Sequence, residues 1–284
     1  MSRTVTLGLD GSNESLSAAD WAACEAAMLE IPLRVVHVGE QQPHDYVPFA
    51  GELIPPPGAD RSARLLIEAK ARLVHRHPGV QVTAEQVAGR PVPTLVAIAR
   101  EAELLVLGSR GLGRVAGVLL GSVALAVVAR AEGPVVLVRG VDRAGEECRP
   151  GVFGRSADPT PYRDVVLGLD LRGPDDRVLE LAFSAAARRA ARLRVVHGGE
   201  PEADAREGLA DVLRPWQGKF PGVEVTEEAV IGDAGAHLVD VSRDASLVVV
   251  GRRNRVGSLG PYIGPVARTV LQHAVAPVAV VPHD

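Results

Sequence analysis

The sequence has almost no lysine and very few aromatic residues. Lysine occurs only at Lys70 and Lys219, so nearly all basic charge is arginine, and the formal net charge is −4. This balance gives no electrostatic footprint for nucleic acid or for an anionic membrane surface. Aromatic residues make up 3% of a chain that is 46% hydrophobic, so the core must be aliphatic. An aliphatic core suits strands that are buried on both faces between helices.

Cysteine and long apolar runs are also scarce. The two cysteines, Cys24 and Cys148, lack the spacing of a CxxC motif or a zinc site, which predicts two free thiols in a reducing compartment. No uninterrupted apolar run reaches about eighteen residues, and the N-terminal MSRTVTLGLDGS lacks the apolar segment of a signal peptide. We therefore expect a soluble, cytoplasmic protein.

The chain contains an internal repeat. The matching segments are VTLGLD (5–10) with VVLGLD (165–170), LRVVH (33–37) with LRVVH (193–197), LLVLGSR (104–110) with LVVVGRR (247–253), and GPVVLVR (133–139) with APVAVVP (276–282). A length of 284 residues also favours about two domains. We predict domains at 1–140 and 162–284, joined by a linker at 141–161 where glycine, proline and charged residues interrupt the periodicity.

Short aliphatic runs alternate with segments of helical spacing in each copy. In the first copy the expected strands are 4–9, 33–38, 80–87, 104–107 and 135–138, and the expected helices are 15–30, 61–77, 93–102 and 123–131. Ser12 or Ser15 is a candidate N-cap of the first helix. This alternation predicts an α/β fold with an open, twisted parallel sheet in each copy and helices on both faces.

A glycine-rich segment, GSRGLGRVAGVLLGSVAL, follows the strand at 104–107. Part of it, beginning at Gly111, fits the dinucleotide fingerprint G-x-G-x-x-A. That fingerprint belongs to the first strand–helix turn of its fold, whereas here it precedes the last strand, and the acid expected after the next strand is missing. A P-loop is excluded because no glycine is followed by lysine and then serine or threonine.

The wider spacing Gly108-x2-Gly111-x9-Gly121-Ser122 resembles the universal stress protein family, whose ATP-binding members carry Gly-x2-Gly-x9-Gly-Ser/Thr after the fourth strand. The resemblance extends to the aspartate that ends the first strand, the His-Val that ends the second, and the final GPVVLV. It implies a tandem two-domain member with two Rossmann-like five-stranded sheets of order 3-2-1-4-5. It also implies that the domains pair through their final strands, 135–138 and 278–281.

The implied strand order predicts where a ligand would bind. Ligands of open parallel sheets lie beyond the carboxyl ends of the strands where the order reverses, here between the strands that end at Asp10 and Gly108. Gly108 and Gly111 would let the main chain approach a polyphosphate, and Gly121-Ser122 would open a helix with free N–H groups, a hydroxyl and the positive end of the dipole. Backbone donors of this kind need no lysine cluster.

The resemblance implies ATP, with or without Mg²⁺, as the ligand. It places Asp10 at the ribose, the backbone of Val38 at the adenine edge and Arg110 near the phosphates. The predicted site comprises Asp10, Val38, Gly108, Arg110, Gly111, Gly121, Ser122 and Val123.

These residues also have purely structural interpretations. Glycine-rich segments often only form turns, Ser122 could be a simple N-cap, and Asp10 could stabilise its own turn. His37 and His197 are expected to be polar ends of buried strands, because no matching ligand triplet predicts a metal site.

The second copy departs from the pattern. Gly251, Asn254, Gly264 and Pro265 stand where the first copy has Gly108, Gly111, Gly121 and Ser122, and Gly198 replaces Val38. A proline at this helix start is structurally comfortable, yet it removes both a hydroxyl and an N–H. We expect one nucleotide site per chain, in the first domain, with the second domain as a structural or regulatory partner.

No catalytic constellation can be placed near the glycine segment, whether Ser-His-Asp, paired carboxylates or a base for water. Together with the family resemblance, this implies a nucleotide-dependent stress-response regulator or sensor, not a fast enzyme, although slow ATP hydrolysis is compatible with it. The alternative is a nucleotide-independent interaction or scaffold protein of the same fold. A homodimer remains open, and neither nucleic acid nor a membrane is an expected partner.

Overall fold

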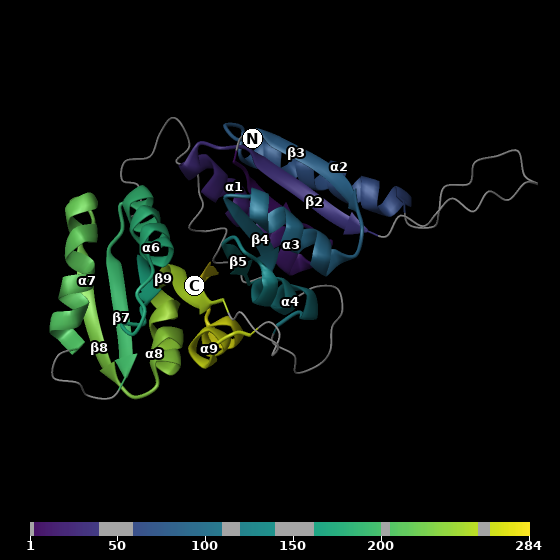
Figure 1. Ribbon diagram of the computed structural model, residues 1–284. Coiled ribbons are helices and arrows are strands. Elements are labelled where there is room, and N and C mark those ends of the chain that lie inside the picture. The colour runs from purple at the N-terminus through teal and green to yellow at the C-terminus, as the bar shows by residue number, and fades with distance from the viewer. Residues whose placement is uncertain (1–2, 40–58, 110–119, 140–161, 200–204, 255–261) are drawn as a thin grey trace, which may run out of the picture.

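The structure is a computed structural model that describes residues 3–39, 59–109, 120–139, 162–199, 205–254 and 262–284. Helices cover both faces of one sheet, and the two copies of the repeat lie side by side with their last strands in contact (Figure 1). The predicted linker at 141–161 lies outside the described residues. We call residues 3–139 the first half and residues 162–284 the second half.

The first half alternates strands and helices as its sequence pattern predicts. Its elements are β1 (Val5–Gly8), α1 (Asn13–Leu29), β2 (Leu33–Gly39), α2 (Ala59–Arg76), β3 (Val82–Ala88), α3 (Pro91–Glu101), β4 (Leu104–Gly108), α4 (Ser122–Arg130) and β5 (Val135–Val138). The helices α1, α2 and α3 each begin two residues earlier than predicted, and α3 begins at Pro91. Proline is tolerated there because the first turn of a helix has no intrahelical acceptor for its N–H groups.

The second half repeats this order. Its elements are β6 (Asp164–Gly168), α6 (Asp176–Arg189), β7 (Leu193–Gly199), α7 (Ala205–Lys219), β8 (Val225–Ile231), α8 (Ala234–Val241), the 3₁₀ turn η1 (Ser242–Asp244), β9 (Ala245–Arg253), α9 (Pro265–His273) and β10 (Val278–His283).

The strands form one continuous sheet in the order β3-β2-β1-β4-β5-β10-β9-β6-β7-β8. Each half has the predicted order 3-2-1-4-5, and its strands are parallel. β5 and β10 are antiparallel, with Val278 opposite Leu137 and Val280 opposite Val135. Pairing through the final strands is thus confirmed, and it joins the two five-stranded sheets into one. All residues of both strands are buried, so two apolar edges cover each other.

Two apolar layers, one on each face, hold the helices to the sheet. α1, α2, α6 and α7 pack on one face, and α3, α4, α8 and α9 pack on the other. Trp21 lies in the first layer, as expected from its helical spacing. The core is mainly aliphatic, but the second half adds an aromatic group in which Phe183 contacts Trp216 and Phe220 at ring-centroid distances of 6.0 and 5.7 Å.

The starts of α1 and α4 differ. Ser12 is the N-cap of α1, and its hydroxyl accepts a hydrogen bond from the Ser15 N–H at 3.1 Å. The N-cap of α4 is Gly121, whose carbonyl accepts the first intrahelical bond from the Leu125 N–H at 3.0 Å. The structural interpretation of Ser122 as an N-cap is therefore wrong, because Ser122 is already the first residue of the helix.

A buried ion pair connects the halves on one face of the sheet. Glu25 on α1 lies 2.5 Å from Arg189 and 3.3 Å from Arg188, both on α6. Glu25 is 1% exposed and Arg189 is 4% exposed. Removing one partner of such a pair would leave a buried charge without compensation, so the pair fixes how the halves meet more than it adds to stability.

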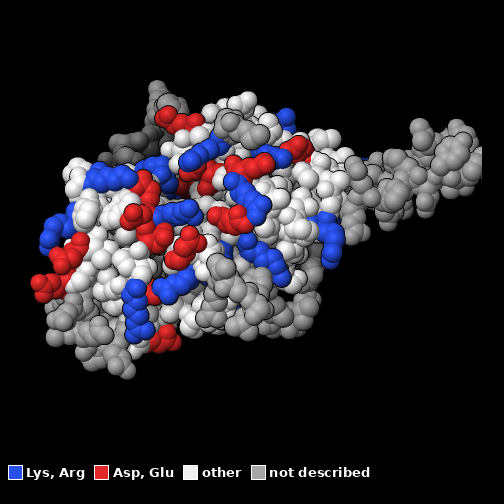
Figure 2. Space-filling view, viewed as in Figure 1, with Lys and Arg blue, Asp and Glu red and all other residues white. Residues whose placement is uncertain are grey.

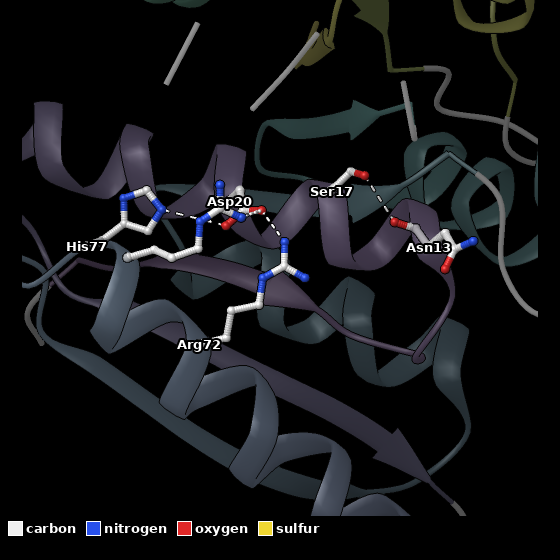
Figure 3. Close-up of polar contacts among 6 residues, drawn as sticks. Asn13, Ser17, Asp20, Arg72 and His77 are labelled. Carbon is white, nitrogen blue, oxygen red and sulfur yellow. Dashed lines mark hydrogen bonds and ion pairs between the residues drawn. The ribbon is translucent and has the colours of Figure 1, made fainter. Parts of the chain in front are cut away.

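A second cluster joins α1 to α2 (Figure 3). The Asp20 carboxylate accepts hydrogen bonds from Arg72 at 2.6 Å and Arg76 at 2.8 Å, and His77 Nε2 lies 3.7 Å from its other oxygen. Burial raises the pKa of Asp20, whereas His77 and the two arginines lower it, and the net effect is a lowered pKa.

The state of Cys24 corrects a prediction from the sequence. Cys24 is disulfide-bonded, so the expected free thiol is not found at this position. Cys148 lies outside the described residues. Cysteine spacing motifs identify local disulfides and metal sites. They do not exclude a disulfide between cysteines that are far apart in the sequence.

Charge is mixed on the molecular surface. Figure 2 shows basic and acidic side chains interspersed on the face in view, with no large field of one sign. Among the described residues, no helix combines the length and the apolar character needed to cross a membrane.

We predict that Glu25→Ala lowers the free energy of unfolding by about 3–5 kcal/mol, because Arg189 keeps its charge without a counter-ion. Glu103→Ala is the matched control. It removes a carboxylate from the exposed pair with Arg3 and should cost less than about 1 kcal/mol. Urea unfolding at neutral pH measures both variants, and similar small losses in the two would contradict the assigned role of Glu25.

We also predict a pH dependence that originates at Asp20. Because its folded-state pKa is lowered, its contribution to stability is present above the ordinary value of 3.8 and is lost as the pH falls through the lower folded value. Asp20→Asn should therefore be less stable than the parent chain near neutral pH, and the two should converge in acid. Unfolding free energies measured across this pH range test the prediction, and a constant difference between the chains would refute it.

Candidate functional site

The first crevice lies where the strand order of the first half reverses. β1 has β2 on one side and β4 on the other. α1 packs on one face of these strands, whereas α3 and α4 pack on the opposite face. Helices that leave to opposite faces open a space at the carboxyl ends of β1 and β4, which is the usual ligand position in open α/β sheets.

This space contains a cavity of about 240 Å³. Six of the eight predicted site residues line it: Asp10, Val38, Gly108, Gly121, Ser122 and Val123. The other two, Arg110 and Gly111, lie outside the described residues. Segments separated by more than a hundred residues thus meet at one cavity, at the edge of the sheet where the sequence places the site.

The start of α4 forms one wall. The Gly121 N–H donates to the Ser109 carbonyl at 2.8 Å, which holds the helix start against the end of β4. The N–H groups of the first turn, including those of Ser122 and Val123, have no acceptor within the helix and carry the positive end of its dipole. The cavity therefore meets a set of backbone donors suited to an anion.

Part of the lining is apolar. Val36 and Val38 come from β2, and Leu95 comes from α3. The cavity is thus lined both by apolar side chains and by the backbone donors at the start of α4.

The sequence did not predict that residues of α3 would line the cavity. Pro91 and Leu95 line the cavity because α3 begins beside the end of β2. The available signal was an amphipathic helix starting at a proline directly after a strand. That pattern predicts which side of the helix faces the core, but it does not predict that the first turn of the helix lies beside a cavity.

Asp10 holds the loop between β1 and α1. Its Oδ1 accepts hydrogen bonds from the Ser12 N–H at 2.9 Å and the Ser12 hydroxyl at 2.6 Å. This is the turn-forming role considered as a structural alternative. Both hydrogen bonds are accepted by the same carboxylate oxygen, and they orient the carboxylate at the cavity wall.

Gly108 has a different reason for being glycine than the one predicted. A Cβ at this position would lie 2.7 Å from the Ser15 nitrogen and 2.8 Å from the Glu14 carbonyl carbon. The missing side chain therefore lets the first turn of α1 pack against the end of β4. The expectation that it clears space for a polyphosphate is not needed to explain this residue.

His37 and His197 occupy equivalent places in the two halves. His37 Nδ1 lies 2.8 Å from the Leu9 carbonyl oxygen, and His197 Nδ1 lies 3.0 Å from that of Leu169. Each ring ties the end of one strand to the loop after its neighbour. Within the described ranges, no three His, Cys, Asp or Glu side chains are grouped to hold a metal ion.

The second crevice is the equivalent space at the ends of β6 and β9. Its cavity measures about 730 Å³, roughly three times the volume of the first. Gly251, Gly264 and Pro265 line it, as their alignment with the first-half motif predicts, whereas Asn254 does not. A cavity is therefore present where the motif is altered, and its larger volume was not predicted from the sequence.

Comparisons with known proteins agree with this architecture. A family model described as the universal stress protein family matches residues 1–139 and 199–282. A universal stress protein of Mycobacterium tuberculosis is 33% identical over 295 residues, covering 97% of this chain and 96% of the relative. The crystal structure of a universal stress protein from Archaeoglobus fulgidus covers 100% of both chains with a TM-score of 0.75 at 19% identity, which shows the shared fold. A universal stress protein solved in complex with cAMP is 32% identical, covers 49% of this chain and 98% of its own, and has a TM-score of 0.38.

The packing of Gly108 leads to a stability prediction. Gly108→Ala should lower the free energy of unfolding by about 1–3 kcal/mol, because the new methyl group would meet α1 backbone that has little freedom to move. Gly79→Ala is the control, since a Cβ there meets nothing within 4 Å. The free energies of unfolding of the two variants are compared by urea unfolding. An unchanged stability of Gly108→Ala would contradict the packing role of Gly108.

Proposed function

The chain belongs to the universal stress protein family, and on that premise we propose that its first crevice binds ATP or a related adenine nucleotide. In this proposal the bound nucleotide regulates the conformation or partner binding of a cytoplasmic stress-response protein. The second half contributes a structural or regulatory partner and no nucleotide site.

One observation supports the proposal above the others. One cavity is lined both by the backbone donors at the start of α4 and by apolar side chains of β2 and α3. A nucleotide needs both features at once, because its phosphates require N–H donors and its base requires an apolar slot with a polar edge.

Each predicted residue then has a place in the complex. The N–H groups of Ser122 and Val123 and the Ser122 hydroxyl would hold phosphate oxygens, with the α4 dipole adding favourable charge. The Asp10 carboxylate would accept a ribose hydroxyl, and the Val38 backbone would bind the adenine edge. Arg110 and Gly111 would extend the phosphate contacts, and Mg²⁺ would accompany the triphosphate as its counter-ion.

We propose binding, not rapid turnover, as the activity. The backbone donors at α4 neutralise phosphate charge, but they neither activate water nor accept a proton. Slow hydrolysis by solvent water is compatible with this arrangement. A measurement of phosphate release during nucleotide binding separates the two: release on the timescale of seconds would contradict a binding module.

A nucleotide-independent scaffold is the second candidate. It is favoured by the observation that Gly108 and Asp10 already have structural roles, one in packing α1 and the other in forming a turn. A scaffold of this fold would act through its joined halves and would not respond to nucleotide.

Calorimetric titration of ATP into the full-length chain tests the proposal. We expect about one site per chain, and we expect Gly121→Val and Ser122→Pro to abolish binding, the first by placing a branched side chain at the mouth of α4 and the second by removing a donor and a hydroxyl. Proline is tolerated at the first position of a helix, so Ser122→Pro should fold.

Gly264→Val is the matched control for these variants. It changes the equivalent N-cap of α9, where a Cβ meets nothing within 4 Å, and should leave ATP affinity unchanged. A stoichiometry of two, or full affinity in both α4 variants, would contradict the assigned site.

A further inference from the structure

The helix α4 is too short to fix its own orientation. It spans nine residues, Ser122–Arg130, and helices of that length are not stable in isolation, so contacts outside the helix decide where it lies. At its start, the Gly121 N–H donates to the Ser109 carbonyl at 2.8 Å. Apolar side chains bury one side of the helix. The position of its C-terminal end depends on what that end contacts.

The second half supplies that contact. Arg252, near the end of β9, donates a hydrogen bond from one Nη atom to the carbonyl of Ala131, which is the C-cap of α4. Ala131 is 1% exposed and Arg252 is 6% exposed, so water has little access to this bond. A hydrogen bond from a charged donor in such a setting is stronger than one between neutral groups at the surface. The far end of α4 is therefore fixed to a strand of the other half.

Arg252 also matches the charge of this helix end. Burial lowers its pKa, and no carboxylate of the described residues counters that effect. A buried cation without a carboxylate is costly unless other groups stabilise it. The last carbonyl groups of a helix carry the negative end of its dipole, so the C-terminus of α4 takes that role. The positive end of the same dipole lies at the first crevice.

The fold itself does not require an arginine at this position. In the repeat, LLVLGSR (104–110) matches LVVVGRR (247–253), which aligns Ser109 with Arg252. Ser109 is also buried, so the equivalent position of the first half accommodates a small side chain. Arg252 therefore serves the contact between the halves and not the strand to which it belongs.

A second arginine makes the opposite contact. Arg139, after β5, donates to the Leu271 carbonyl in the last turn of α9 at 3.0 Å. The position aligned with Arg139 in the second half is Pro282, which has no side-chain donor. The two contacts thus come from different positions of the repeat, and each can be removed without altering the other.

We propose that Arg252 is a positioning residue for the nucleotide site of the first crevice, on which it acts from the second half by fixing the C-terminal end of α4. The inference rests on the proposed function of that crevice. With its far end fixed, α4 keeps its first turn at the cavity wall before a nucleotide arrives, so binding requires less ordering of the helix. The second half thereby regulates nucleotide affinity through this contact.

Calorimetric titration of ATP into the full-length chain compares Arg252→Met and Arg252→Lys with the parent. Methionine is unbranched and has neither charge nor donor, and we expect Arg252→Met to weaken ATP binding by about fivefold or more with the stoichiometry unchanged. Lysine keeps a cation with N–H donors, so Arg252→Lys should recover part of the affinity. Arg130→Met is the matched control, because it removes an exposed arginine from the last turn of α4 itself, and it should leave the affinity unchanged.

Hydrogen exchange of the backbone amides, measured without nucleotide, tests the helix contact directly. Arg252→Met should accelerate exchange in α4 and leave α9 unchanged, and Arg139→Met should do the reverse. Unchanged exchange in α4, equal acceleration in both helices, or full ATP affinity in Arg252→Met would overturn the proposal. A parent chain that binds no ATP would refute the proposed function, and exchange in α4 would then still decide whether Arg252 fixes the helix.

Discussion

The placement of β1 beside β4, with their helices on opposite faces of the sheet, is the constraint on which the rest of the structure depends. It brings the turn after β1, the end of β4 and the start of α4 to one edge of the sheet, although these segments are far apart in the chain. The second half repeats the constraint with β6 and β9. Both crevices are therefore consequences of strand order, and the side chains decide only what each crevice accepts.

The joint between the halves makes one molecule of these two units. The antiparallel pair β5–β10 covers both apolar edges, and the Glu25–Arg189 pair fixes the contact on the α1–α6 face. On the opposite face each half sends an arginine to the end of a helix of the other. Arg252 donates to the Ala131 carbonyl after α4, and Arg139 donates to the Leu271 carbonyl in α9. Since α4 and α9 begin at the two crevices, each of these helices is held at its far end by the other half.

The fold was predictable from the sequence because the same order of strand-like and helix-like segments occurs in both copies of the repeat. Aliphatic runs with matching ends give the strands, and the family resemblance supplies the order and the pairing of the final strands. The candidate site was predictable as a location: residues as distant as Asp10 and Ser122 do line one cavity. The role of Gly108 was not predictable, because the clash that excludes a side chain comes from the α1 backbone. The volume of the second crevice depends on packing between segments that no local sequence pattern records.

The two crevices differ in their linings. Gly121 and Ser122 stand at the start of α4, whereas Pro265, which has no N–H, begins α9, and two arginines of β9 line the second cavity. The same fold therefore provides two equivalent spaces with different side chains around them.

A crystal structure of the full-length chain grown with excess ATP tests the central claim most directly. The account predicts phosphate oxygens within hydrogen-bonding distance of the Ser122 and Val123 N–H groups, with the base beside Val38. A first crevice that holds only water under these conditions, or a nucleotide bound solely between β6 and β9, would contradict it.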